Sequence, residues 1–358
     1  MADFYCVQLN RTSWNVPRKY EDLVPIGHGV FGLVCAATNS DAEAECKRVA
    51  IKKYTRPFET TETAKRTFRE VKILSYLRHD NIIRLLDLFT PDSCFENFAD
   101  LYFVSDFCGY DLASILKDSP KLPTADQVQL IVYQMMRALK YIHSAGIIHR
   151  DLKPHNVAVN EDSDVKILDF GLARQIDKDM SDYVVTRWWR APEIVMKWIK
   201  YDQKVDIWSV GCIMAECITG KTLFPGSDEI DQYMRIVRLV GTPSSELLAK
   251  MSPSASSYIQ DMPRFEPVKF TDHFPGISDQ AADFLKAALS LDPEKRPSAA
   301  EGLNHPYFEK WHDPDDEPVT VPMEEALDLK LTKDQWKERI WNEVLKFRRS
   351  SSDASGVS

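Results

Sequence analysis

Two short motifs constrain the fold of this chain more than any other feature. They are HRDLKPHN at residues 149–156 and DFG at residues 169–171. The segment between them is rich in β-branched and aliphatic residues at both ends and polar in the middle, which predicts two short strands joined by a turn. Such a hairpin would return Asp169 to the neighbourhood of Asn156. The two motifs are therefore expected to meet at one site.

The side chains of these motifs suit phosphoryl transfer. Asp151 can accept the proton of a hydroxyl group, and Lys153 can stabilise charge on a transferring group. Asn156 and Asp169 carry the oxygen ligands that Mg²⁺ prefers. A DFG triplet alone usually marks only a turn after a strand, but here it follows the longer motif at the spacing that this chemistry needs.

Length and composition favour a large intracellular protein. With 358 residues, of which 44% are apolar, the chain exceeds the size at which one core usually suffices. Its 45 basic and 54 acidic residues give a net charge of −9, which argues against direct nucleic-acid binding. The cysteines form no CxxC pair, and no apolar stretch is long enough to cross a bilayer. We expect a protein of the cytoplasm and nucleus, with reduced thiols and no membrane contact.

The order of elements predicts an α+β fold in which a small β-rich lobe precedes a larger helical lobe. The expected strands span 30–38, 48–53, 82–89 and 101–105, a helix spans 61–77, and later helices span 203–219, 227–240, 278–291 and 333–347. The predicted division is an N-terminal extension at 1–19, an N-lobe at 20–105, a hinge at 106–109, a C-lobe at 110–308, a C-terminal extension at 309–349 and a disordered tail at 350–358.

A glycine-rich run predicts a lid over nucleotide phosphates. It comprises Ile26, Gly27, His28, Gly29, Val30, Phe31, Gly32, Leu33 and Val34. Glycine lets a backbone approach phosphate oxygens because no Cβ stands in the way. The run continues as a strand and opens no helix, which favours a hairpin over ATP rather than a dinucleotide site. Taken alone, it is also compatible with a simple glycine-rich turn.

A lysine on a predicted strand supplies the next part of this site. Lys52 ends the segment VAIK, in which Ala50 is expected to line the nucleotide site. A buried ammonium group needs a negative partner, and phosphate oxygens and Glu70 can both provide one. An ion pair between Lys52 and Glu70 would fix the predicted helix against the N-lobe. Either residue taken singly would more often be a solvated surface residue.

The predicted hinge can bind the rest of a nucleotide. Asp106, Phe107 and Cys108 can present backbone groups to adenine. Asp111 is placed to bond the ribose, although an Asp before a helix is frequently only a cap. Ser105 is small, which predicts access to a pocket behind the adenine.

Further landmarks complete a family pattern, because APE at 191–193, DIWSVG at 206–211 and Arg296 follow in order. Over roughly residues 15–348 the chain resembles a mitogen-activated protein kinase of the stress-activated subfamily. The supporting stretches include RPF at 56–58, AKRT at 64–67, YIHSAG at 141–146, an insert at about 241–276 and LTKDQW at 331–336. The resemblance implies a bilobal kinase fold, ATP and Mg²⁺ as cofactors, and transfer of the γ-phosphate to Ser or Thr followed by Pro in protein substrates.

The resemblance also implies activation by an upstream dual-specificity kinase at a Thr-x-Tyr triplet, for which this chain has Ser181, Asp182 and Tyr183. We predict that Ser181 and Tyr183 are phosphosites. The arginines expected to receive the phosphates are Arg66, Arg69 and Arg150 for Ser181, and Arg187 and Arg190 for Tyr183. The fixed charge of Asp182 would indicate a weaker dependence on phosphorylation or a different activating enzyme, and the alternative is a tolerated substitution. His155 and Trp189 also depart from the subfamily's usual residues.

An acidic run in the C-terminal extension matches the family's docking site for basic motifs. Its carboxylates are Asp313, Asp315 and Asp316, and Glu161 and Asp162 would extend the surface. The usual interpretation of such a run is only a solvated loop. The resemblance implies binding of an upstream MAP kinase kinase, substrates, phosphatases and scaffolds by a monomer.

Two alternatives remain open. A pseudokinase scaffold would bind partners without catalysis, but no catalytic group is missing from the sequence. A cyclin-dependent kinase is disfavoured by the acidic run, the insert and the C-terminal extension.

Overall fold

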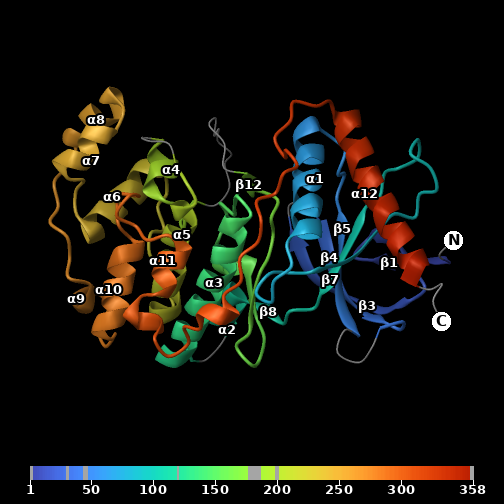
Figure 1. The fold of residues 1–358 in the computed structure, drawn as a ribbon, viewed down its shortest axis with the longest axis horizontal. Helices are drawn as coiled ribbons and strands as arrows, with labels where there is room; N and C mark the ends of the chain where they lie inside the picture. The colour runs from blue at the N-terminus through green and yellow to red at the C-terminus, as the bar shows by residue number, and fades with distance from the viewer. Residues whose placement is uncertain are drawn as a thin grey trace.

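The computed structural model describes residues 3–29, 32–42, 47–118, 121–175, 187–197 and 201–354. These residues form a β-rich lobe, on the right of Figure 1, and a helical lobe on the left. The α+β bilobal fold predicted from the sequence is therefore confirmed. No helix in the described ranges combines the length and apolar character needed to span a membrane.

Strands dominate the first lobe and helices the second. The strands are β1 (Phe4–Leu9), β2 (Thr12–Pro17), β3 (Tyr20–Gly29), β4 (Gly32–Asn39), β5 (Arg48–Tyr54), β6 (Leu85–Phe89), β7 (Tyr102–Asp106), β8 (Tyr110–Asp111), β9 (Ile147–Ile148), β10 (Val157–Val159), β11 (Val165–Ile167) and β12 (Arg174–Gln175). The α-helices are α1 (Thr61–Tyr76), α2 (Leu112–Asp118), α3 (Ala125–Ser144), α4 (Pro192–Met196), α5 (Lys204–Thr219), α6 (Glu229–Val240), α7 (Ser245–Lys250), α8 (Pro253–Gln260), α9 (Phe270–His273), α10 (Asp279–Ala288), α11 (Ala299–Leu303) and α12 (Lys333–Ala354). Short 3₁₀ turns span Pro154–Asn156, Pro306–Phe308 and Pro314–Asp316.

The main sheet has the antiparallel order β3-β4-β5-β7-β6. Because side chains alternate between the faces of a strand, Val49 and Ile51 of β5 point to one face, while Ala50 and Lys52 point to the other. Val49 and Ile51 lie in a buried cluster with Trp14. The opposite face is left for the site described below.

The N-terminal hairpin covers the apolar face of this sheet. The sequence predicts an extension here but no strands. Strands β1 and β2 pair in antiparallel register, and Trp14 is only 1% exposed. The backbone N–H of Asn15 donates to the Tyr102 hydroxyl at 3.0 Å, and Lys53 Nζ donates to the Ser13 carbonyl at 2.8 Å. The hairpin is thus part of the lobe's core.

Helix α1 crosses the lobe and meets the end of the chain. It begins with a capping box, in which Thr60 and Thr63 bond each other's backbone N–H groups. Its Phe68 ring packs against Trp336 of α12, with ring centroids 5.1 Å apart, and the two helices lie side by side in Figure 1. Helix α12 continues to Ala354, so the predicted disorder is wrong for residues 350–354. Polar composition excludes a core position but does not stop an established helix from propagating.

Helix α3 is the central element of the second lobe. Its apolar residues, which include Val128, Val132 and Ile142, recur at helical spacing and are buried.

A buried ion pair lies elsewhere in this lobe. Arg296 is fully buried and binds the Glu193 carboxylate through two nitrogens, at 2.8 and 3.2 Å. The insert at about 241–276 contains α7, α8 and α9.

Candidate active site

The predicted ion pair between strand and helix is present. Lys52 Nζ lies 2.6 Å from Glu70 Oε1, and both side chains are largely buried, at 19% and 6% exposed. Lys52 stands opposite Val34 on β4, and Ala50 stands opposite Ser105 on β7, so these side chains share the face that lacks the hairpin. The contact fixes α1 to the sheet and directs an ammonium group to this face.

The catalytic-loop motif and the DFG motif meet as the sequence predicts. Strands β10 and β11 form the expected antiparallel hairpin. The side-chain amide of Asn156 donates to the Asp151 carbonyl at 2.8 Å and to its carboxylate at 3.2 Å. The Asn156 carbonyl accepts the N–H of Leu168, the residue before Asp169, at 2.9 Å. Asn156 therefore joins Asp151 to the segment that leads from β11 into Asp169.

Asp151 is buried and surrounded by cationic groups. Lys153 Nζ lies 3.0 Å from its Oδ2, and an Arg190 nitrogen lies 3.6 Å from its Oδ1. His155 stands exposed on the same loop, with its ring edge-on to Trp189 at 6.4 Å. Trp189 in turn donates its indole N–H to Glu216 at 2.8 Å.

Asp206, at the start of α5, holds the catalytic loop in place. Its fully buried carboxylate accepts the backbone N–H groups of His149 and Arg150 at 2.9 and 2.8 Å, and it lies 2.9 Å from His143 Nε2. Burial by itself would raise the pKa of Asp206. The hydrogen bond and charge of His143, together with His149 and the Arg150 N–H, outweigh burial and lower the pKa. The sequence motif identifies Asp206 but does not reveal this anchoring role.

Asp169 is held as an anion at the end of this hairpin. Its Oδ1 accepts the Gly171 N–H at 3.1 Å and lies 3.8 Å from an Arg66 nitrogen. Burial opposes ionisation, but the charges of Lys52 and Arg66 and the Gly171 hydrogen bond hold the pKa of Asp169 below its usual value. Its φ of 55° is unusual for a non-glycine residue and is typical of strain at a functional site.

The glycine-rich run forms the β3–β4 hairpin. Gly27 pairs with Val34, and a Cβ on Gly32 would lie 2.5 Å from the Lys53 carbonyl oxygen, so the close approach of β4 to β5 requires glycine there. Ile26 is 48% exposed beside this hairpin. The backbone of His28 and Gly29 pairs with Leu33 and Gly32. The predicted lid residues Val30 and Phe31 lie outside the described residues.

The hinge follows β7 directly. The Cys108 thiol donates to the Asp106 carbonyl at 3.4 Å, and Phe107 is covered by the Arg48 guanidinium at 4.1 Å. Gly109 has a φ of +77°, and a Cβ there would lie 2.8 Å from the Val159 carbonyl. Ser105 is buried with its hydroxyl 3.3 Å from the Asp106 carbonyl. The hinge therefore passes close to β10.

Asp111 caps the helix that follows the hinge. Its carboxylate accepts the Ser114 N–H at 3.0 Å and the Ser114 hydroxyl at 2.7 Å. This arrangement supports the cap that the sequence offers as an alternative, while the ribose contact stays a prediction.

Comparison with known proteins agrees with this geometry. The protein kinase domain family matches residues 20–308. The chain is 51% identical to mitogen-activated protein kinase 14 of Xenopus laevis, covering 96% of this chain and 94% of the relative. It is 50% identical to mitogen-activated protein kinase pmk-1 of Caenorhabditis elegans, covering 97% and 91%.

This chain belongs to the mitogen-activated protein kinases. The resemblance to the stress-activated subfamily predicted from the sequence is confirmed, and the MAP kinase is a serine/threonine protein kinase that uses ATP.

The arginines predicted to receive phosphate come from separate elements of this MAP kinase. Burial lowers the pKa of Arg150, and the positive charges of Arg174, Arg190 and Arg69 lower it further, although Tyr201 opposes them. Arg174, Arg190 and Arg69 therefore each lie close enough to Arg150 for their charge to act on it. Arg174 of β12 is missing from the sequence-based prediction, because nothing in its local sequence indicates its neighbours.

The other predicted arginines have different surroundings. Arg66 lies beside Asp169, and Arg187 donates to the Ser227 carbonyl at 2.6 Å. The predicted phosphosites Ser181 and Tyr183 lie outside the described residues.

The acidic run of the MAP kinase lies on one face of α3. Arg137 binds the Asp316 carboxylate at 2.7 Å and donates to its carbonyl, while Gln134, one turn earlier on α3, donates to the Ser163 carbonyl at 2.8 Å. Helix α3 thus carries the turn with the acidic run and the turn that contains residues 161 and 162. The predicted docking carboxylates Glu161, Asp162, Asp313, Asp315 and Asp316 are all exposed. Their carboxylates are therefore accessible to a basic segment.

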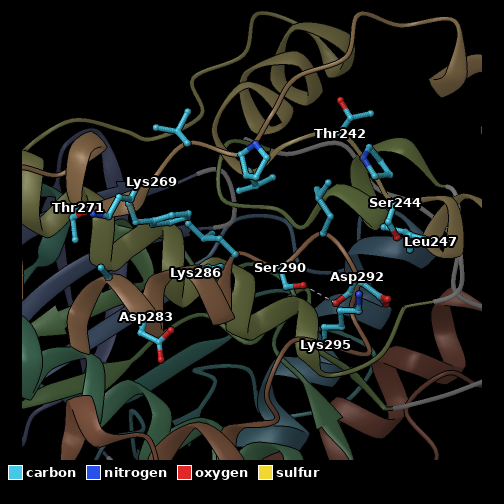
Figure 2. A pocket seen from close by; sticks show the side chains of 18 of the residues that line it. Thr242, Ser244, Leu247, Lys269, Thr271, Asp283, Lys286, Ser290, Asp292 and Lys295 are labelled. Atoms are coloured by element: carbon cyan, nitrogen blue, oxygen red, sulfur yellow. Dashed lines mark hydrogen bonds between the residues drawn. The ribbon is translucent and has the colours of Figure 1, made fainter. Parts of the chain in front are cut away.

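A surface cavity of about 540 Å³ lies elsewhere in the kinase, between the start of the insert and α10. Figure 2 shows its lining, which includes Thr242, Leu247, Lys269, Lys286 and Asp292. It shares no residue with the site described above. The chemistry is therefore assigned to the residues of β5, α1, the catalytic loop and the DFG motif, and not to this cavity.

Proposed function

We propose that this MAP kinase transfers the ATP γ-phosphate to Ser or Thr followed by Pro, within a phosphorylation cascade. The observation that carries the proposal is the pair of bonds from the Asn156 amide to Asp151, together with the bond from Leu168 N–H to Asn156. They support a site at which Asp151 acts as proton acceptor close to the DFG carboxylate and the Lys52–Glu70 pair.

In the proposed mechanism, Asp151 orients the acceptor hydroxyl and takes its proton. Lys153, which lies 3.0 Å from Asp151, stabilises negative charge on the transferring group. Lys52 binds phosphate oxygens of ATP, and the ion pair with Glu70 positions the Lys52 ammonium group for this contact. Catalysis by positioning and electrostatics suits phosphoryl transfer, because the protein forms no covalent bond to the phosphate.

The donor set at this site fits Mg²⁺. The amide nitrogen of Asn156 is used in bonds to Asp151, which leaves its Oδ1 available as a ligand, and Asp169 is held ionised. Two protein oxygens suffice, since Mg²⁺ usually completes its octahedron with water and substrate phosphates. When bound, Mg²⁺ neutralises charge on the phosphates. Adenine would lie against the hinge at 106–108, and the ribose near Asp111.

The test is phosphate transfer by the full chain after the substitution Asp151→Asn. We expect the variant to lose at least a hundredfold in kcat while its melting temperature and ATP affinity stay close to the wild type. Asp334→Asn, an exposed matched change at the start of α12, should have wild-type activity. Unchanged Mg²⁺-dependent transfer by Asp151→Asn would reject the assignment, and an inactive wild type that still binds partners would indicate a pseudokinase.

We further propose that an upstream dual-specificity kinase activates this protein by phosphorylating Ser181 and Tyr183. The grouping of Arg69, Arg150 and Arg174 supports an anionic ligand near α1 and the catalytic loop. Mass spectrometry before and after cellular stress should detect both phosphates. Stimulated activity that survives Ser181→Ala unchanged would contradict the role of Ser181.

The exposed acidic surface on α3 supports docking of basic segments from activators, substrates, phosphatases and scaffolds. We propose that the kinase acts as a monomer in the cytoplasm and nucleus. Fluorescent tagging of the full chain and light scattering would test these two points.

A further inference from the structure

The side chain of Gln175 makes three hydrogen bonds to one distant segment. Its Nε2 donates to the carbonyls of Met323 at 2.9 Å and Glu325 at 3.0 Å, and its Oε1 accepts the Leu327 N–H at 3.1 Å. Both donors and the acceptor of the amide are thus used on alternate residues of the same backbone. Such an arrangement fixes the register of that segment. We call residues 323–328 the C-terminal strap.

The other side of the strap holds α1. Asp328 binds Arg69 and lies 3.0 Å from Lys65, while Glu325 lies 2.6 Å from Lys72. Burial opposes ionisation of Asp328, but the charges of Arg69 and Lys65 outweigh it and lower its pKa. These bonds act on the helix that carries Glu70, the residue after Arg69. In Figure 1 the orange-red segment before α12 runs from the helical lobe past β12 to α1.

Packing alone does not fix the strap. Met323 and Leu327 are buried and anchor it through apolar contacts. A cavity of about 480 Å³ lies against it, however, lined by Gly146, Gln175, Ala326 and Asp328 among others. Beside this cavity, polar contacts complement the buried apolar side chains in fixing the position of the strap on the lobe. Gln175 supplies three of them.

Gln175 is also tied to the catalytic loop. Strand β12 pairs with β9, with Gln175 opposite Ile147, and β9 leads directly into His149. A displacement of β12 would therefore displace both the catalytic loop and the C-terminal strap.

We propose that Gln175 is a positioning residue that sets the Lys52–Glu70 ion pair through the C-terminal strap and α1. The proposal rests on the proposed kinase function. The chain of contacts runs from Gln175 to the strap backbone, from Asp328 to Arg69, and from the adjacent Glu70 to Lys52. Gln175 touches no reacting atom, so its removal acts on how ATP is held and not on proton transfer.

The test compares full-length Gln175→Ala and Gln175→Glu with the matched control Gln129→Ala. Gln129 also bridges to a C-terminal backbone, through the Tyr307 carbonyl at 2.5 Å, but at the far end of α3. We expect both Gln175 variants to lower kcat/KM for ATP about three- to tenfold, because only part of the free energy of the lost hydrogen bonds is transmitted to the ATP site. The KM for a peptide substrate should not change. Gln175→Glu keeps the shape and loses the two donors, so it should resemble Gln175→Ala.

Hydrogen exchange provides the readout that a purely structural role would not give. Amides of α1 at 61–76 should exchange faster in both Gln175 variants, whereas Gln129→Ala should leave α1 and kcat/KM for ATP unchanged. In an Asp328→Asn background, Gln175→Ala should add little, because both act through the strap.

The proposal is overturned if folded Gln175→Glu keeps wild-type kcat/KM for ATP, or if Gln129→Ala has the same effect. Additive effects of the Gln175 and Asp328 changes would also reject it. Its failure is distinct from failure of the proposed function, since the wild type would then phosphorylate peptide normally.

Discussion

Replacing Asp206 with Asn should cost this kinase both stability and turnover. The Asp206 carboxylate is fully buried and receives two backbone N–H groups and the His143 ring. Asn has the same shape but only one acceptor oxygen, so it leaves the N–H of His149 or Arg150 facing an amide NH₂ group. Breaking such a buried charged contact costs about 3–5 kcal/mol.

At about 2 °C per kcal/mol for a domain of this size, we expect the melting temperature to fall by roughly 6–10 °C. Both N–H groups belong to the catalytic loop, so loss of either bond can displace the loop, and misplacing a reacting group by ~1 Å costs about a hundredfold in rate. Calorimetry and steady-state kinetics at 20 °C, where the variant is still folded, separate the two effects. Asp202→Asn is the matched control, since Asp202 is exposed and caps the start of the same helix.

The pH dependence gives a second check on this residue. Because the folded pKa of Asp206 is lowered, its contribution to stability is fully present above the unfolded pKa of about 4 and is lost as the pH falls through the lower folded value. Asp206→Asn should therefore lose less stability than the wild type on acidification below pH ~4. A variant with wild-type melting temperature, kcat and acid sensitivity would refute the reasoning.

Three further outcomes follow from the described contacts. Lys52→Met should leave Glu70 without its partner and lower kcat at least about a hundredfold, while the protein stays folded. Peptide phosphorylation measures the activity and circular dichroism the folding. Retention of activity would contradict the assigned role. Arg296→Lys should lower the free energy of unfolding by about 3–5 kcal/mol, because an ammonium group cannot bind the Glu193 carboxylate and the nearby carbonyls together. Urea denaturation measures this loss, and a midpoint equal to that of the wild type would contradict it. Reversing the charge of Asp315 and Asp316 to Lys should weaken capture of a basic docking peptide about tenfold or more at low salt while sparing turnover of a short substrate peptide; equal loss of both would argue against docking.

The parts predicted from the sequence share one property: the residues that act together are close in the chain or belong to a motif of fixed spacing. The β10–β11 hairpin follows from its alternating pattern, and it brings Asn156 to Asp151 and to the DFG strand as predicted. The Lys52–Glu70 pair could be predicted because Glu70 lies on the helix that follows the strand of Lys52 in the chain.

The parts that were missed depend on long-range contacts. Arg69 appears in the sequence as a free phosphate receiver, yet it binds Asp328, which lies near the other end of the chain. Gln175 and Arg174 lie in a two-residue strand whose pattern carries no signal. The tail beyond 349 looked too polar for order, but helix α12 extends into it. For Arg69, Arg174 and Gln175 the tertiary environment, and not local propensity, decides the outcome, whereas the tail continues an established helix.

The hairpin of residues 4–17 has a practical consequence for anyone trimming this protein. The matched domain begins at residue 20, so a version cut there would keep every catalytic side chain and lose Trp14 and Val16 from the lobe's outer core. The side chains that they cover, including Val49 and Tyr102, would be exposed to water as an apolar patch. Such a shortened enzyme should aggregate during purification, although it retains every residue assigned to catalysis.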